Sequence, residues 1–94
     1  MIVNFSRRAE TDLVEIALWI AQDNPERAVS FTRELRAACE KIAILPRAYR
    51  KAPAFGPKAR RKNHGSYAIF FDLNDEAILI TTIVHGARDL DALT

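Results

Sequence analysis

Residues 67–84 have the sequence YAIFFDLNDEAILITTIV, and this stretch decides the fold. Residues 67–73 and 77–84 are rich in aromatic and β-branched side chains, which favour β-strands. Asn74 and Asp75 lie near the junction of the two segments and are typical of a turn. Because residues 77–84 are apolar on both faces, we expect them to form a central strand of a sheet.

The segment before this pair of strands is short and strongly basic. We expect residues 59–64 to form an edge strand, because Gly65-Ser66 after them is typical of a tight turn into residues 67–73. Residues 46–58 are expected to be a rather rigid loop, since they contain Pro46, Pro53, Gly56 and Pro57.

The N-terminal part predicts a strand followed by a helix. Residues 2–5 are a short apolar run, and Ser6 after them can cap a helix over residues 7–22. The apolar side of this helix contains Ala9, Leu13, Ile16, Ala17 and Ile20, and the polar side contains Arg8, Asp12, Glu15 and Gln22. Trp19 falls on the polar side, an unusual place for a large aromatic residue.

A second helix is predicted over residues 25–45. Asn24 can cap it, and Pro25 suits the first helical position, where the missing N–H costs nothing. Its apolar stripe contains Ala28, Phe31, Leu35, Ala38, Ile42 and Leu45, and Pro46 ends it. Cys39 lies beside this stripe, which favours a buried packing role over a reactive one.

The element order is therefore β-α-α-β-β-β. The short link at residues 23–24 predicts an antiparallel helical hairpin, and the first strand must join the sheet made by the later strands. We expect a two-layer α+β fold in which the hairpin packs on one face of a small, mainly antiparallel sheet. The whole chain, residues 1–94, is expected to be one domain, with one more helical turn at residues 88–93.

Composition excludes several classes of protein. The chain is 49% hydrophobic and 28% charged, which is ordinary for a globular protein and argues against disorder. Its single cysteine leaves no disulfide framework and no multi-cysteine metal site, and we expect no cofactor or metal. Neither a membrane span nor a signal peptide is visible, so a cytoplasmic setting is expected.

Charge is unevenly distributed along the chain. Residues 41–71 contain eight Lys and Arg and no Asp or Glu, although the net charge of the whole chain is only +2. Such a basic stretch favours polyanions or an acidic protein surface as partners. The alternative is a solvated loop and edge strand, in which the charges serve to keep the edge soluble.

One set of residues could support catalysis: Arg60, Arg61, Lys62, His64, Tyr67, His85 and Arg88. A ribonuclease that uses the ribose 2′-hydroxyl needs a base, a cation on the phosphate and an acid for the leaving oxygen. Histidine, tyrosine and arginine can supply all three. Sequence spacing does not show whether these side chains converge, and strand-end histidines are more often structural.

Several segments together resemble the ParE toxins of the RelE/ParE superfamily. The helical positions include Asp12-Leu13, Trp19-Ile20-Ala21 and Asn24-Pro25. Leu45-Pro46, Gly56 and Arg60 fit the loop and basic strand, Tyr67-Ala68-Ile69-Phe70-Phe71 is similar to the family's "Y-L-I-F-Y" strand, and His85-Gly86-Ala87-Arg88-Asp89 is similar to its "H-G-x-R-D" ending. This resemblance covers almost the whole chain and implies the same β-α-α-β-β-β order.

The resemblance implies the toxin of a type II toxin–antitoxin system that is neutralised by a cognate antitoxin and poisons DNA gyrase by contact. DNA would then be bound indirectly, through the antitoxin. Partner contacts are expected at Trp19, Arg50, Lys51, Lys58, Arg60, Arg61, Lys62, His85 and Arg88. No catalytic residue is implied.

Two alternatives stay open. A RelE-like, ribosome-dependent mRNA endoribonuclease would use Arg60, Arg61, His64, Tyr67 and Arg88 as its catalytic residues. An inactive relative would only bind its antitoxin. Convergence of the cationic and aromatic side chains on one concave face would favour the nuclease.

Overall fold

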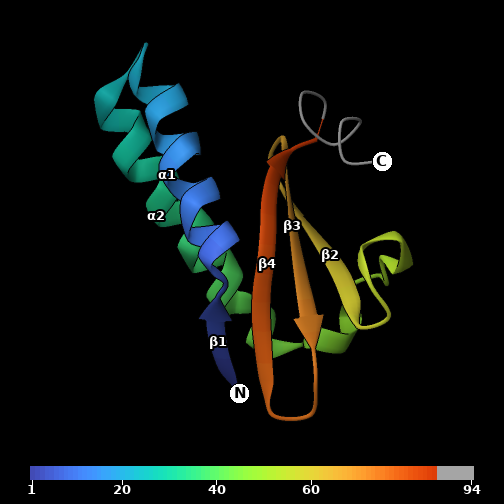
Figure 1. Cartoon of the computed structure of the whole chain (residues 1–94). Coiled ribbons are helices and arrows are strands. Elements are labelled where there is room, and N and C mark those ends of the chain that lie inside the picture. The colour runs from blue at the N-terminus through green and yellow to red at the C-terminus, as the bar shows by residue number, and fades with distance from the viewer. Residues whose placement is uncertain (87–94) are drawn as a thin grey trace.

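In the computed structural model, which describes residues 1–86, a helical hairpin packs on one face of a four-stranded sheet (Figure 1). Its elements are β1 (Ile2–Phe5), α1 (Arg7–Ala21), α2 (Pro25–Lys41), β2 (Ala59–His64), β3 (Tyr67–Leu73) and β4 (Ala77–His85). The strand order is β1-β4-β3-β2; β1 runs parallel to β4, and the other neighbours are antiparallel. This confirms the predicted α+β class, the element order and the central position of β4. The helical turn predicted at residues 88–93 lies outside the described residues.

Both predicted helix caps are present. The Ser6 hydroxyl accepts a hydrogen bond from the Ala9 N–H at 3.0 Å, and the Asn24 side chain accepts one from the Arg27 N–H at 3.0 Å. Such caps satisfy N–H groups that the first turn of a helix leaves without partners. They fix where α1 leaves β1 and where α2 begins.

The second helix is shorter than the predicted range of residues 25–45. The α-helix stops at Lys41, and residues Ile42–Ile44 continue as a single 3₁₀ turn. The sequence pattern predicts Leu45 in the apolar stripe, but Leu45 is 66% exposed and its backbone is not helical, with a φ of −141° and a ψ of 69°. Pro46 accounts for the conformation of Leu45, because a proline disfavours the helical conformation of the residue before it.

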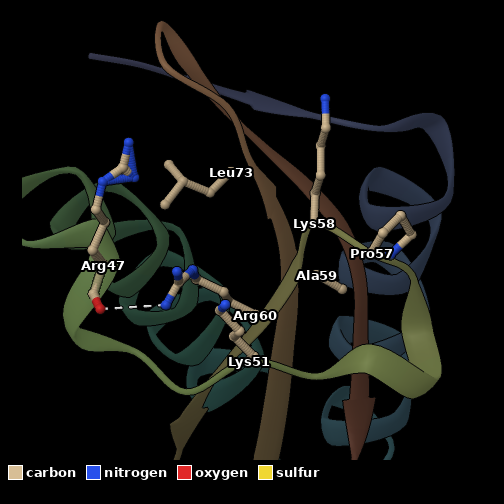
Figure 2. A pocket seen from close by; sticks show the side chains of 7 residues that line it. All are labelled: Arg47, Lys51, Pro57, Lys58, Ala59, Arg60 and Leu73. Carbon is tan, nitrogen blue, oxygen red and sulfur yellow. Dashed lines mark hydrogen bonds between the residues drawn. The ribbon is translucent and has the colours of Figure 1, made fainter.

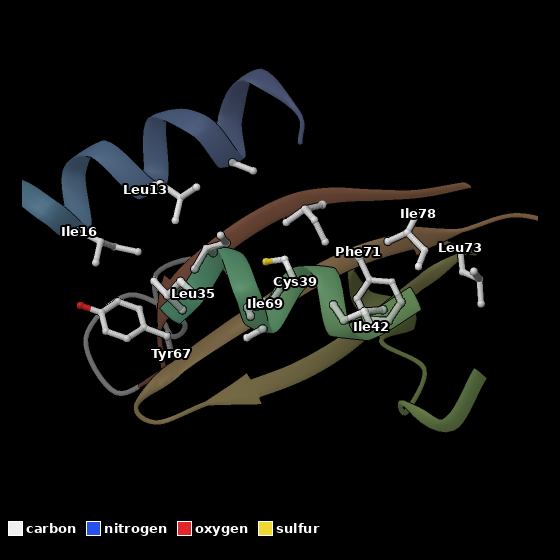
Figure 3. Close-up of a cluster of buried hydrophobic side chains, with 14 residues drawn as sticks. Leu13, Ile16, Leu35, Cys39, Ile42, Tyr67, Ile69, Phe71, Leu73 and Ile78 are labelled. Atoms are coloured by element: carbon white, nitrogen blue, oxygen red, sulfur yellow. The ribbon is translucent and has the colours of Figure 1, made fainter. Parts of the chain in front are cut away.

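The core lies between the hairpin and the sheet (Figure 3). Leu13 and Ile16 of α1 and Leu35 of α2 share one buried cluster with Ile69 and Phe71 of β3. The other core residues include Ala9, Ala38, Cys39, Ile42, Tyr67, Leu73, Ile78, Ile80 and Ile83. Burial raises the pKa of the Cys39 thiol to about 12, so the predicted packing role of this cysteine fits its position.

A β-bulge in β4 sets which side chains enter this core. Phe70 of β3 pairs with Thr82, but the next residue, Phe71, pairs with Ile80, so Thr81 is left over. An extra residue shifts the alternation of a strand by one position. As a result Ile80 and Ile83, which are three residues apart, are both buried in the core with the helices.

Asp12 is not on the polar side of α1, as the sequence pattern suggested. The residue is buried, with 8% of its surface exposed, and its carboxylate accepts a hydrogen bond from the Ile83 N–H at 2.9 Å. The pairing of β1 with β4 ends at Phe5, opposite Ile80, so β4 has no strand partner on this side beyond that point. Ser6 covers the same edge, because its N–H and hydroxyl donate to the carbonyls of Ile80 and Thr81. The beginning of α1 therefore replaces the missing strand.

The opposite face of the sheet is partly covered by the loop that follows α2. This loop contains two further 3₁₀ turns, Pro46–Ala48 and Pro53–Phe55. The Phe55 ring stacks on Phe70 with ring centroids 3.9 Å apart, and a second small cluster forms there with Ala68 and Val84. The proline-rich loop predicted from the sequence is thus a packing element as well as a connection.

Candidate functional site

The largest of the described hollows is lined by residues from the end of α1, the first half of α2, the β2–β3 turn, the start of β3 and the end of β4. We call it the aromatic groove; its volume is ≈ 420 Å³, and it is lined by Trp19, Ile20, Arg27, Phe31, Gly65, Ser66, Tyr67 and His85. Gly65 has a φ of +56°, a conformation that glycine adopts without strain, and this allows the tight turn between β2 and β3. Segments far apart in the sequence therefore build one open, mainly aromatic hollow.

Aromatic rings pack against one another along this groove. The Tyr67 ring lies 5.4 Å from Phe31 and 5.2 Å, edge-on, from the imidazole of His85. The Phe31 ring also lies 5.9 Å from His64, just outside the groove lining. Such ring pairs add about 0.5–1.5 kcal/mol each beyond the area that they bury. The rings form a rigid apolar floor.

Charged groups border the floor on the side of α2. The Arg27 guanidinium lies 5.0 Å from the centre of the Phe31 ring and forms an ion pair with Glu34. The hydrogen bond from Arg27 holds the pKa of the Glu34 carboxyl below its ordinary value. The Nε2 atom of His64 lies 4.0 Å from Glu34. A partner in the groove would meet an aromatic floor with a charged rim, a common design for protein recognition.

The basic strand β2 divides its cations between the two faces of the sheet. Arg60 is paired with Phe71, whose ring lies in the core, so Arg60 faces the helices. Arg61 is paired with Phe70, and its guanidinium lies 5.6 Å from that ring on the opposite face. Neighbouring residues of a strand point to opposite faces, and this alternation separates the two arginines.

Two of these cations hold the loop and α2 in place. The Nη1 atom of Arg60 donates to the carbonyl oxygen of Tyr49 at 2.7 Å and to that of Arg47 at 3.3 Å. Lys62 donates through Nζ to the Ala38 carbonyl near the end of α2, at 3.0 Å. Arg47 and Tyr49 lie in the loop after α2, so Arg60 bonds carbonyls outside the regular backbone ladders. Arg60 and Lys62 therefore support the structure, besides any contact they make with a partner.

A second hollow lies where β2 begins and is strongly cationic (Figure 2). We call it the basic pocket; it has a volume of ≈ 180 Å³ and is lined by Arg47, Lys51, Lys58 and Arg60 together with Pro57, Ala59 and Leu73. Figure 2 shows the Arg47 and Lys58 side chains extending on either side of Leu73. Backbone pairing between residues 50–52 and 59–61 brings Lys51 to this site.

The hairpin also exposes large apolar side chains to solvent. Val14 and Leu18 are one turn apart on α1 and are 57% and 63% exposed. Trp19 is 53% exposed, and Val29 of α2 is exposed as well. Single exposed apolar residues are ordinary on a protein surface, whereas larger exposed apolar patches are typical of interaction sites, so these side chains are candidates for contact with a partner.

The structure brings together only part of the predicted site. Trp19, Tyr67 and His85 meet at the aromatic groove with His64 close by, and Lys51, Lys58 and Arg60 meet at the basic pocket. Arg61 lies on the other face of the sheet, Arg50 is exposed beside β2, and Lys62 is bonded to α2. Arg88 lies outside the described residues. The five candidates for ribonuclease catalysis are therefore not seen together.

Sequence reasoning missed three contributors to these sites. Arg27 and Phe31 of α2 line the aromatic groove, and Arg47 lines the basic pocket. The sequence pattern placed Phe31 in the apolar stripe of its helix and Arg47 in the basic stretch, but it marked neither as a site residue. The signal for Arg47 was its position after Pro46, in a loop rich in cations.

The described residues 1–86 contain no group of three or more His, Cys, Asp and Glu side chains that could hold a metal ion. Within the same range, no helix is long and apolar enough to cross a membrane.

The structure combines a helical hairpin on a mixed four-stranded sheet with exposed apolar side chains on the hairpin and a basic edge strand. Residues 3–90 match the family described as the ParE toxin of the type II toxin–antitoxin system parDE. The chain belongs to this family and is a ParE-type toxin of a type II toxin–antitoxin system, which implies an antitoxin as its partner protein.

A solved structure supports the fold independently. It is described as a chromosomal ParDE toxin–antitoxin system from P. aeruginosa, and the match covers 90% of this chain and 95% of that chain, with a TM-score of 0.76 and 18% sequence identity. At this identity the likeness concerns the fold. No curated protein matches the sequence significantly.

Proposed function

We propose that this toxin inhibits DNA gyrase by contact and that its antitoxin neutralises it by covering the exposed hairpin. Membership of the ParE family supports the choice of target. The observation that carries inhibition by contact is the division of the cations of β2 between two faces of the sheet. A protein interface can use both faces of the sheet, whereas catalysis needs all the catalytic side chains to converge around one reacting phosphate.

The geometry gives the ribonuclease alternative little support. Arg60 and His64 share a face, but they are four residues apart on β2, roughly 13 Å along an extended strand. Arg60 is also bonded to two backbone carbonyls, and Arg61 is on the far face. A base, a phosphate-binding cation and an acid would have to lie within hydrogen-bond reach of the reacting atoms.

Purified toxin is expected to inhibit supercoiling of relaxed plasmid by gyrase or to accumulate cleaved DNA, and added antitoxin is expected to reverse the effect. If inhibition is by contact, His64→Ala, His85→Ala and Tyr67→Phe should each keep at least part of it. Tyr67→Phe is chosen because it keeps the buried ring in place. Loss of all inhibition in one of these folded variants would contradict contact-based action, and no effect of the wild type on gyrase would contradict the target.

Neutralisation is assigned to the hairpin because large apolar side chains of both its helices, Val14, Leu18, Trp19 and Val29, are exposed. Burying Val14 and Leu18 under a partner would remove aliphatic surface from water, and fully burying one such side chain stabilises a complex by about 1.5–3 kcal/mol. The basic residues of β2 and its loop would mainly speed the approach of an acidic antitoxin segment. Raised salt should therefore slow association more than it speeds dissociation.

The double variant Val14→Ser/Leu18→Ser is expected to bind the antitoxin about 100-fold more weakly, because roughly tenfold is lost for each buried aliphatic side chain. Isothermal titration calorimetry with the purified antitoxin measures this change. Ile44→Ser is the matched control, since Ile44 is an aliphatic side chain exposed outside the hairpin. An unchanged affinity of the double variant, or an equal loss in the control, would contradict the assignment of this surface.

A further inference from the structure

The basic pocket has a composition suited to one kind of ligand. Four cationic side chains, from Arg47, Lys51, Lys58 and Arg60, surround a volume of ≈ 180 Å³, and none of the described residues that line it is acidic. This space is large enough for several waters or one phosphate group. Like charges gathered at one place repel one another, and a bound anion would relieve this repulsion.

Two of these cations have different interactions within the protein. Arg60 is fixed, because its Nη1 atom donates to the carbonyls of Tyr49 and Arg47 and leaves other N–H groups of the guanidinium available. Arg47 forms an ion pair with Asp75 at 3.3 Å, but the side chains are 60% and 96% exposed. An exposed pair of this kind is worth at most about 1 kcal/mol and exchanges readily for another anion.

We propose that the basic pocket binds the phosphodiester backbone of duplex DNA. An acidic peptide is the competing ligand, but peptide recognition draws most of its affinity from aromatic and aliphatic anchors. The described lining of this pocket has no aromatic side chain, and its apolar members are Pro57, Ala59 and Leu73. Phosphate contacts need only charge and N–H donors. The choice of duplex DNA also rests on the proposed function, because gyrase holds duplex DNA while it acts.

The proposal separates two surfaces of the toxin. The aromatic groove lies between the two helices and the end of the sheet formed by the β2–β3 turn and the end of β4, and the exposed apolar side chains lie on α1 and α2. The basic pocket lies instead at the start of β2 and in the loop before it. One surface would contact protein while the other holds the DNA backbone. DNA contact would then be direct, and it would not require the antitoxin.

Direct binding is tested with purified toxin and a fluorescently labelled 20-base-pair duplex, without gyrase or antitoxin, by anisotropy between 50 and 200 mM salt. With about three or four phosphates neutralised, the plot of log K against log salt should have a slope of roughly −3. Lys51→Ala/Lys58→Ala should flatten the slope by about 2 units and weaken binding about 10–100-fold at 100 mM salt. Both lysines are exposed, so the variant should keep its fold and its thermal midpoint.

The matched control is Arg7→Ala/Arg33→Ala, which removes the same charge from exposed positions on the helices. The control should change binding only slightly. The proposal would be overturned if the wild type did not bind the duplex or if the control variant lost as much affinity as Lys51→Ala/Lys58→Ala. It would also be overturned if a poly-glutamate peptide bound through Lys51 and Lys58 as tightly as DNA does.

A parallel gyrase assay separates this proposal from the proposed function. Toxin that inhibits gyrase without binding duplex DNA would overturn the proposal for the pocket and leave gyrase inhibition standing. Toxin that binds the duplex through Lys51 and Lys58 but does not affect gyrase would support the pocket and contradict the target.

Discussion

Replacing Asp12 by alanine is expected to destabilise the toxin by about 2 kcal/mol, although α1 itself would form well with alanine at this position. The Asp12 carboxylate accepts the hydrogen bond of the buried Ile83 N–H at 2.9 Å, beyond the point where β1 stops pairing with β4. Without it, the N–H has neither a protein acceptor nor ready access to water, and such a buried group costs about 1–3 kcal/mol. Urea denaturation followed by circular dichroism measures the loss.

Asp12→Asn is the matched control, since its side-chain oxygen can still accept from Ile83. Burial raises the pKa of Asp12 above its ordinary value, more than the Ile83 N–H and Arg8 lower it. The unfolded chain therefore releases this proton at a lower pH than the folded chain does. As the pH rises from the pKa of Asp12 in the unfolded chain to its higher pKa in the folded chain, the wild type should lose stability relative to Asp12→Asn. This role of Asp12 would be contradicted if the difference in stability between the wild type and Asp12→Asn did not depend on pH. It would also be contradicted if Asp12→Ala were as stable as the wild type.

The largest loss of stability is expected for Phe71→Ala, at about 3–5 kcal/mol. Phe71 is fully buried between the sheet and the hairpin (Figure 3). Its ring packs edge-on against Tyr49, with ring centroids 5.9 Å apart. Truncation leaves a cavity that the surrounding side chains can fill only in part. A domain of this size has a total stability of about 5–10 kcal/mol, so the variant should be close to unfolding.

Phe55→Ala is the comparison for Phe71→Ala, and it should cost less. Phe55 stacks on Phe70 but is only partly buried, on the face of the sheet away from the helices. Denaturation midpoints of the two variants at 25 °C measure the difference. If Phe55→Ala were as damaging as Phe71→Ala, the loop over the outer face would be as important to stability as the main core. Loss of toxicity in Phe71→Ala would accordingly report unfolding and would not identify a contact with the target.

The sequence alone predicted the local structure well. Ser6 and Asn24 marked the helix starts, Gly65-Ser66 marked the turn between β2 and β3, and residues 77–84 were correctly placed at the centre of the sheet. Caps, turns and the period of apolar residues act over a few positions, so they can be recognised without the fold. The ordered set of segments also pointed to the ParE family, which the family match confirmed.

Only the tertiary structure decided which side chains meet. The bulge at Thr81 placed Ile83 in the core and directed its N–H to Asp12, which looked like an ordinary polar residue of α1. Strand alternation placed Arg60 and Arg61 on opposite faces, while the hairpin brought Phe31 to Tyr67. The physical reason is that periodicity fixes the face of each residue within its own element. Strand register and the packing of the layers determine which distant residues that face contacts.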